Sequence, residues 1–75
     1  MATKKITQSA IKQLIKSGAA IDIDEIKGKK PAHGDLEKIG VSFGTLGMNG
    51  ALFLHRKTRK MYAIKARNST LMYYV

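Results

Sequence analysis

The sequence predicts a small α+β domain, in which one N-terminal helix packs on a small, mainly antiparallel β-sheet. Three observations predict this class. A short stretch with helical apolar spacing lies between residues typical of helix ends. Apolar and acidic residues alternate over residues 19–24, and strand signals dominate from Leu36. Turn-forming residues separate the strand-like runs. Since domains usually run roughly 50–250 residues, we expect the 75 residues to form a single domain, residues 1–75.

The predicted helix lies between Thr7 and Gly18. Thr7 is the expected N-cap, because its hydroxyl can accept a hydrogen bond from a first-turn N–H group, and Gly18 suits the left-handed position that ends a helix. The apolar residues between these caps form one stripe, Ala10, Ile11, Leu14 and Ile15. A helix of about ten residues is not stable alone, so we expect this stripe to pack on a sheet.

The first strand is predicted over residues 19–24, where apolar and acidic residues alternate. Ile21 and Ile23 are expected to face the helix. Asp22 and Asp24 are expected to face water.

The middle of the chain alternates between loops and extended structure. A loop over residues 27–34 and a glycine-rich connection over residues 44–50 lie on either side of an alternating apolar run, Leu36–Phe43, which indicates extended chain. Within the glycine-rich connection, Asn49-Gly50 is the strongest turn signal in the chain.

Three further strands are predicted at residues 51–55, 61–66 and 70–75, which are rich in β-forming residues. The basic segment Arg56–Lys60 joins the first two as a five-residue hairpin loop, and residues 67–69 form a second turn. The predicted order is α-β-β-β-β, with a C-terminal three-stranded meander.

Alternation within these strands assigns their side chains to two faces of the sheet. The face expected against the helix holds Leu52, Leu54, Tyr62, Ile64, Leu71, Tyr73 and Val75. The opposite face is expected to hold Phe53, Met61, Met72 and Tyr74 beside basic residues. Because an isolated apolar patch is a liability on a monomer, the opposite face is predicted to be a binding or self-association surface.

Positive charge is concentrated in the second half of the chain. The sequence has 14 lysine and arginine residues against 5 aspartate and glutamate residues, a formal net charge of +9. Residues 38–75 hold seven of the basic residues and no acidic residue. Since mixed signs would serve solubility better, this asymmetry indicates an anionic partner: nucleic acid, an acidic protein surface or anionic lipid.

The first functional hypothesis is a nucleic-acid-binding module, for DNA or RNA, that engages phosphates through the basic hairpin and its strand face. The rings that could stack on bases are Phe53, Tyr62, Tyr73 and Tyr74. The residues expected to carry binding are Arg56, Lys57, Arg59, Lys60, Lys65 and Arg67, with Tyr74 as the stacking ring. The segment Gly28–Pro31 is a second basic point, which is either an exposed connector or a bracket for the same ligand from another side.

The second hypothesis is an interaction or inhibitor protein that docks on an acidic protein surface, of the kind found as an accessory protein of a phage or mobile element. The face of Phe53, Met61, Met72 and Tyr74 would then form the centre of the interface and the basic residues its rim. Homodimerisation through an edge strand, either residues 21–24 or the strand that ends at Val75, stays open.

Catalysis, a cofactor and a metal are not expected. The chain has no cysteine, and its serines lack the surroundings of an activated nucleophile. The run 44–50 has no following helix and no lysine at the P-loop position, so it is expected to be a wide turn. Asp22 and Asp24 with His33 downstream could hold a divalent ion, but two carboxylates on a short strand are more often its solvated side.

A membrane partner is not expected either. No segment approaches the roughly 20 apolar residues needed to cross a bilayer, and the basic N-terminal residues precede no apolar run like that of a secretory signal. We therefore expect a soluble, cytoplasmic protein.

Overall fold

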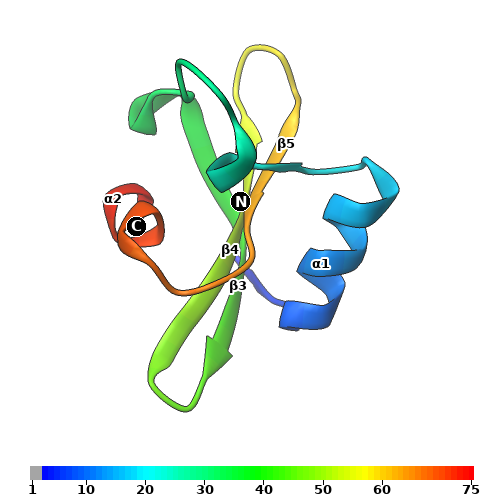
Figure 1. Ribbon diagram of the computed structural model, residues 1–75, viewed down its shortest axis with the longest axis vertical. Helices are drawn as coiled ribbons and strands as arrows, with labels where there is room; N and C mark the ends of the chain where they lie inside the picture. Colours follow the sequence, from blue (N-terminus) through cyan, green and yellow to red (C-terminus); the bar gives the residue numbers. More distant parts are fainter. Residues whose placement is uncertain (1–2) are drawn as a thin grey trace.

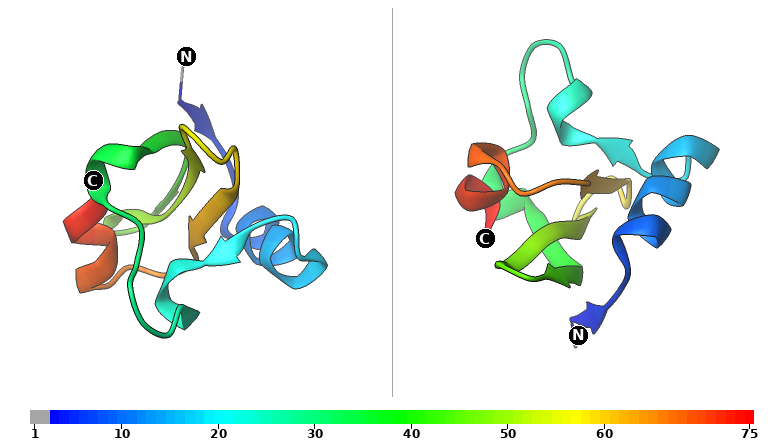
Figure 2. Two further views of the ribbon diagram at one scale, coloured as in Figure 1. Left: turned by 90° about the horizontal axis from the view of Figure 1, so that it is seen from above. Right: turned by 60° about the horizontal axis from the view of Figure 1, so that its bottom comes forward.

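A computed structural model describes residues 3–75 and places a five-stranded mixed sheet between two helices (Figure 1). Helix α1 (Gln8–Ser17) covers one face and the shorter helix α2 (Ser69–Tyr74) covers the other, as Figure 2 also shows. The strands are β1 (Lys4–Lys5), β2 (Ile21–Asp22), β3 (Leu36–Gly44), β4 (Gly47–His55) and β5 (Met61–Ile64). The predicted α+β class is confirmed, whereas the arrangement of the strands differs from the prediction.

The sheet has the order β1-β3-β4-β5-β2. The long strands β3, β4 and β5 form an antiparallel meander, in which Phe53 lies opposite Tyr62. Both edge strands are two residues long and pair in parallel, with Lys4 opposite Gly40 at one edge and Ile21 opposite Tyr62 at the other. The meander is therefore formed by β3, β4 and β5 and not by the last three predicted strands.

The predicted N-terminal helix forms as α1. The Thr7 hydroxyl accepts a hydrogen bond from the Ala10 N–H group at 3.1 Å, and Gly18 ends the helix with a φ of +84°. Ile11 is fully buried against the sheet, in a cluster with Leu52. Neither α1 nor any other helix within residues 3–75 is long and apolar enough to cross a membrane.

The C-terminal segment forms helix α2, so the strand predicted over residues 70–75 is wrong. The Asn68 side chain caps this helix by accepting a hydrogen bond from the Leu71 N–H group at 2.9 Å. Leu71 and Tyr74, which are three residues apart, are buried on the sheet, as helical periodicity requires. The edge of β5 that another strand would need is already paired with β2. The edge strand ending at Val75, considered for dimerisation, is thus absent.

Because a helix covers each face of the sheet, the predicted division of side chains is corrected. The cluster against α1 includes Leu52, Met61 and Ala63, and the cluster against α2 includes Phe53, Tyr62, Ile64, Leu71 and Tyr74. The predicted exposed face of Phe53, Met61, Met72 and Tyr74 does not exist. Phe53 and Tyr74 are buried beneath α2, Met61 packs on the α1 side, and Met72 alone among these four is exposed. Tyr73 and Val75, predicted to face the N-terminal helix, are exposed.

The strand predicted over residues 19–24 is limited to β2. Oδ1 of Asp22 accepts a hydrogen bond from the Asp24 N–H group at 3.0 Å and turns the chain into a short 3-10 helix, Ile23–Glu25. The predicted facing is wrong for three of the four residues, whereas Asp24 is exposed as predicted. Asp22 is buried, Ile21 is exposed, and Ile23 is buried on the α2 side.

The tight turn after β3 lies at Gly44–Gly47 and not at Asn49-Gly50, where it was expected. Gly47 supplies the positive φ, +104°. Asn49 and Gly50 are inside β4, and a Cβ atom on Gly50 would approach the Ile64 carbonyl oxygen to 2.9 Å. Gly50 is therefore needed for close approach within the sheet and not for a turn.

Candidate nucleic-acid interface

The predicted five-residue hairpin loop is confirmed. It connects His55, the last residue of β4, with Met61, the first residue of β5, and all of its residues are exposed. Four of the five residues Arg56–Lys60 are basic. The loop therefore projects four positive charges from one end of the sheet (Figure 1).

His55 holds the backbone of this loop. Its N–H group donates to the Lys60 carbonyl at 2.8 Å, and its carbonyl accepts from the Arg59 N–H group at 3.0 Å. Its Nδ1 atom accepts from the N–H groups of Lys57 and Thr58, each at 3.2 Å. Sequence reasoning interprets His55 only as a polar residue of a loop or strand edge and misses this role. The sequence feature that could have indicated this role is a side chain with a hydrogen-bond acceptor directly before a turn, as in Asx turns.

Most of the positive charge of the loop is not neutralised by the protein itself. Arg56 Nη1 lies 3.7 Å from Glu37 Oε1, but such an accessible ion pair contributes little energy. Within residues 3–75, no carboxylate lies within 4.0 Å of the charged groups of Lys57, Arg59 or Lys60. These three side chains are therefore available to an external anion.

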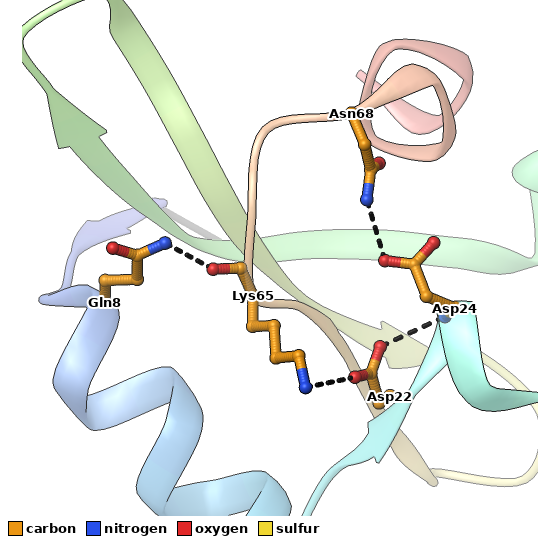
Figure 3. A network of polar contacts seen from close by, with 5 residues as sticks. All are labelled: Gln8, Asp22, Asp24, Lys65 and Asn68. Atoms are coloured by element: carbon orange, nitrogen blue, oxygen red, sulfur yellow. Dashed lines mark hydrogen bonds and ion pairs between the residues drawn. The ribbon is translucent and has the colours of Figure 1, made fainter.

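Lys65, predicted as part of the interface, is engaged by an acid. Its Nζ atom lies 3.5 Å from Oδ2 of the buried Asp22, as Figure 3 shows, in an ion pair that lacks hydrogen-bond geometry. The Lys65 carbonyl accepts a hydrogen bond from the Gln8 side chain, and Asn68 donates to Asp24 Oδ2 at 2.8 Å. Lys65 thus belongs to a polar network that joins β2 to the neighbouring segments.

Arg67 lies far from the hairpin loop. Its Nη1 atom donates a 2.8 Å hydrogen bond to the Leu46 carbonyl in the β3–β4 turn. This turn and the loop Arg56–Lys60 lie at opposite ends of the antiparallel strands (Figure 1). Because β5 ends at Ile64, the structure does not bring Arg67 together with the four loop cations.

The predicted stacking rings differ in accessibility. Phe53 is buried, and so is Tyr74, whose hydroxyl donates to the Pro31 carbonyl at 2.6 Å. Burial, with a smaller contribution from the neighbouring Tyr73, raises the pKa of Tyr74 above its ordinary value. In contrast, Tyr62 is half-buried and Tyr73 is 67% exposed. Tyr74 is therefore a core residue, and Tyr62 and Tyr73 are the accessible rings.

The second basic point lies beside these accessible rings. The segment Lys29–Ala32 lines two open hollows. The first, of about 450 Å³, is also lined by His55 and Tyr62, and we call it the hairpin-side hollow. The second, of about 520 Å³, is also lined by residues of α2 including Tyr73, and we call it the helix-side hollow. Lys29 and Lys30 thus line the same hollow as His55, whose hydrogen bonds hold the backbone of the hairpin loop.

The acidic residues that were considered as ligands of a divalent ion are not clustered with one another in residues 3–75. Within the described part of the chain, no group of three His, Cys, Asp or Glu side chains lies close enough together to hold a metal ion. Asp22 is buried and Asp24 is exposed, so these two carboxylates do not share the solvated strand face that was expected.

In comparisons with known proteins, the chain matches no family model, no curated protein and no solved structure.

Proposed function

We propose that this chain is a small nucleic-acid-binding module that engages phosphate groups through the loop Arg56–Lys60. The observation that carries the proposal is the loop itself, with four exposed cations on a backbone held by His55. Three of these cations have no carboxylate within 4.0 Å among the described residues. When such cations meet phosphates, counterions are released from the nucleic acid, which is the main source of non-specific affinity.

Lys29 and Lys30 support the proposal from a second segment of the chain. Both are exposed, and both line the hairpin-side hollow together with His55. A phosphate backbone that follows the loop could therefore continue onto this segment. Cations from two segments contact more phosphates than the loop alone, so binding is expected to weaken steeply as salt is added.

The test is charge reversal in the loop. The double variant Arg59→Glu/Lys60→Glu should bind labelled single-stranded and duplex oligonucleotides about tenfold or more weakly at low salt, as measured by fluorescence anisotropy. The plot of log affinity against log salt concentration should also become shallower, by about one unit for each phosphate contact that is lost.

A matched control is available on α1. Lys12→Glu/Lys16→Glu changes the net charge by the same amount at two exposed positions away from the loop, and should keep most of the affinity. Unchanged binding in the loop variant would overturn the proposal. An equal loss in both variants would mean that overall charge, and not this loop, determines affinity.

The exposed side of α2 favours a second candidate, an interaction or inhibitor protein that docks on an acidic protein surface. Met72 and Tyr73 are 65% and 67% exposed, and Lys29 and Lys30 line the adjoining hollow. Methionine and tyrosine are enriched at interface centres, whereas charged residues are common at the rim. Recovery of the tagged protein from cells with and without nuclease separates the two functions. A stoichiometric protein partner that survives nuclease favours the second.

A further inference from the structure

We propose that the nucleic acid bound by this chain is single-stranded, and that unpaired bases enter the two hollows beside Lys29–Ala32, where Tyr62 and Tyr73 stack on them. This inference rests on the proposed function. It specifies that the nucleic acid is single-stranded and that its bases bind in the two hollows.

The hairpin-side hollow has the composition of a base-binding site. His55 and Tyr62 both line it, with ring centroids 6.4 Å apart, and Ile26 and Pro31 supply apolar surface. Its volume of about 450 Å³ falls in the roughly 300–1,000 Å³ range of small-molecule sites. Every base has an aromatic face, so stacking on Tyr62 would tolerate different sequences.

The helix-side hollow offers a second ring that is already held in position. Tyr73 meets Tyr74 edge-on with centroids 5.0 Å apart, and it meets His33 at 6.3 Å. A ring that is fixed before binding loses little conformational entropy when a base stacks on it. Ser69 and Thr70 also line this hollow, and a hydroxyl group can form a hydrogen bond with a base edge.

The charges indicate which part of a nucleotide would occupy the hairpin-side hollow. Lys29 and Lys30 line it as exposed cations, while the carboxylate-bearing Asp35 also lines it. Asp35 disfavours a phosphate inside the hollow, but a carboxylate can accept a hydrogen bond from the exocyclic amino group of a base. This arrangement places bases inside and phosphates on Lys29, Lys30 and the hairpin loop.

A duplex does not fit this arrangement. Its bases are stacked on one another and paired, so that only their edges and the phosphates are accessible to a protein. A single strand can turn its bases toward the aromatic rings while its backbone follows the cations, as in other proteins that bind single strands. The two hollows, which share the lining segment Lys29–Ala32, would then accept bases from the same strand.

The experiment compares three probes of about ten nucleotides, a length within the usual range of single-strand sites. They are a labelled single strand, the matching duplex and an abasic strand that has the sugar-phosphate backbone without bases. The single strand should bind more tightly than the abasic strand, by roughly 5- to 150-fold for each base that is stacked. Equal affinity for the single and abasic strands, or tighter binding of the duplex, would overturn the inference.

Variants at the two stacking rings, Tyr73 on α2 and Tyr62 on β5, make the test specific. Tyr73→Ala should reduce the preference for the single strand over the abasic strand. Met72→Ala is the matched control, because Met72 is 65% exposed, lies on the same helix and does not line either hollow. Tyr62→Leu should have the same effect as Tyr73→Ala, and Tyr62→Phe, which keeps the ring, should retain affinity. Thermal melting of each variant checks that it is folded.

The outcomes separate this inference from the proposed function. If Arg59→Glu/Lys60→Glu loses binding while Tyr73→Ala and Tyr62→Leu bind the single strand like the parent protein, the loop binds phosphates and the base-stacking inference is wrong. If the loop variant binds as well as the parent protein, both proposals fail.

Discussion

The Tyr74 hydroxyl donates a 2.6 Å hydrogen bond to the Pro31 carbonyl, and this contact ties the last helix to the segment that lines both hollows. The Tyr74 ring also packs on Phe53, with centroids 5.7 Å apart. Helix α2 therefore completes the core with one side and presents Tyr73 to solvent with the other.

Stability should fall at high pH because of Tyr74. Burial, followed by the neighbouring Tyr73, raises the pKa of Tyr74 above 10.0. The folded protein then keeps this proton to a higher pH than the unfolded chain does. Its stabilising contribution is fully present below pH 10 and is lost as the pH rises through the folded pKa. Urea denaturation across this range measures the decline.

The matched variant for this pH effect is Tyr74→Phe. It should be about 0.5–1.5 kcal/mol less stable than the parent protein at neutral pH, because the hydrogen bond to Pro31 is lost. Its stability should decline less above pH 10, because the ionisable hydroxyl is absent. An identical decline in both proteins would show that Tyr74 does not cause it.

The helical conformation of residues 69–74 predicts which substitutions there are tolerated. Leu71→Ala should lower the free energy of unfolding by about 2–5 kcal/mol, because Leu71 is 1% exposed in the core. Met72→Ala should change it by about 0.5 kcal/mol or less, because that side chain is 65% exposed. Tyr73→Ala should cost about 0.5–1.5 kcal/mol, because only its edge-on contact with Tyr74 is lost. A strand would instead make Leu71 and Tyr73 equally sensitive, so chemical denaturation of the three variants distinguishes the two conformations.

Gly50 should be intolerant of any side chain. Gly50→Ala would bring a Cβ atom to 2.9 Å from the Ile64 carbonyl oxygen and 3.1 Å from Ile11 Cδ1, and should cost about 1–3 kcal/mol in the free energy of unfolding. Gly34→Ala is the control, because nothing lies within 4 Å of its added Cβ atom, and should stay within about 0.5 kcal/mol. Comparable destabilisation of both variants in thermal melts would contradict this assignment.

The role of His55 can be tested by hydrogen exchange. His55→Ala removes the acceptor of the Lys57 and Thr58 N–H groups, and these two amides should exchange faster while those of β3 are unaffected. His55→Asn places a carbonyl oxygen near the position of Nδ1 and should restore much of the protection. Slow exchange in His55→Ala would mean that the loop is held without this side chain.

Features with local determinants could be predicted from the sequence. Helix α1 depends on Thr7, on Gly18 and on a stripe of apolar residues, all within one short segment. The hairpin loop Arg56–Lys60 could be predicted for the same reason, because basic residues between two strands remain exposed regardless of the remaining fold.

Features that depend on contacts between distant segments could not be predicted from the sequence. The residues of α2 are β-forming in isolation, but the Asn68 cap and the pairing of β2 with β5 determine a helix there. The same pairing brings Asp22 opposite Ala63 and therefore near Lys65, which removes Lys65 from the set of free cations. No periodicity in the sequence reveals that residues so far apart are neighbours.

Both edges of the sheet are formed by one stretch of chain, since β1 pairs with β3 and β2 pairs with β5. During synthesis this stretch emerges before its partners exist, and the hydrogen bond between the Thr3 hydroxyl and the Lys38 carbonyl spans 35 residues. The meander of β3, β4 and β5 can form first because its strands are neighbours in the chain. We therefore expect the N-terminal stretch to dock after the meander, where it covers the two strand edges that would otherwise be open to pairing with another chain.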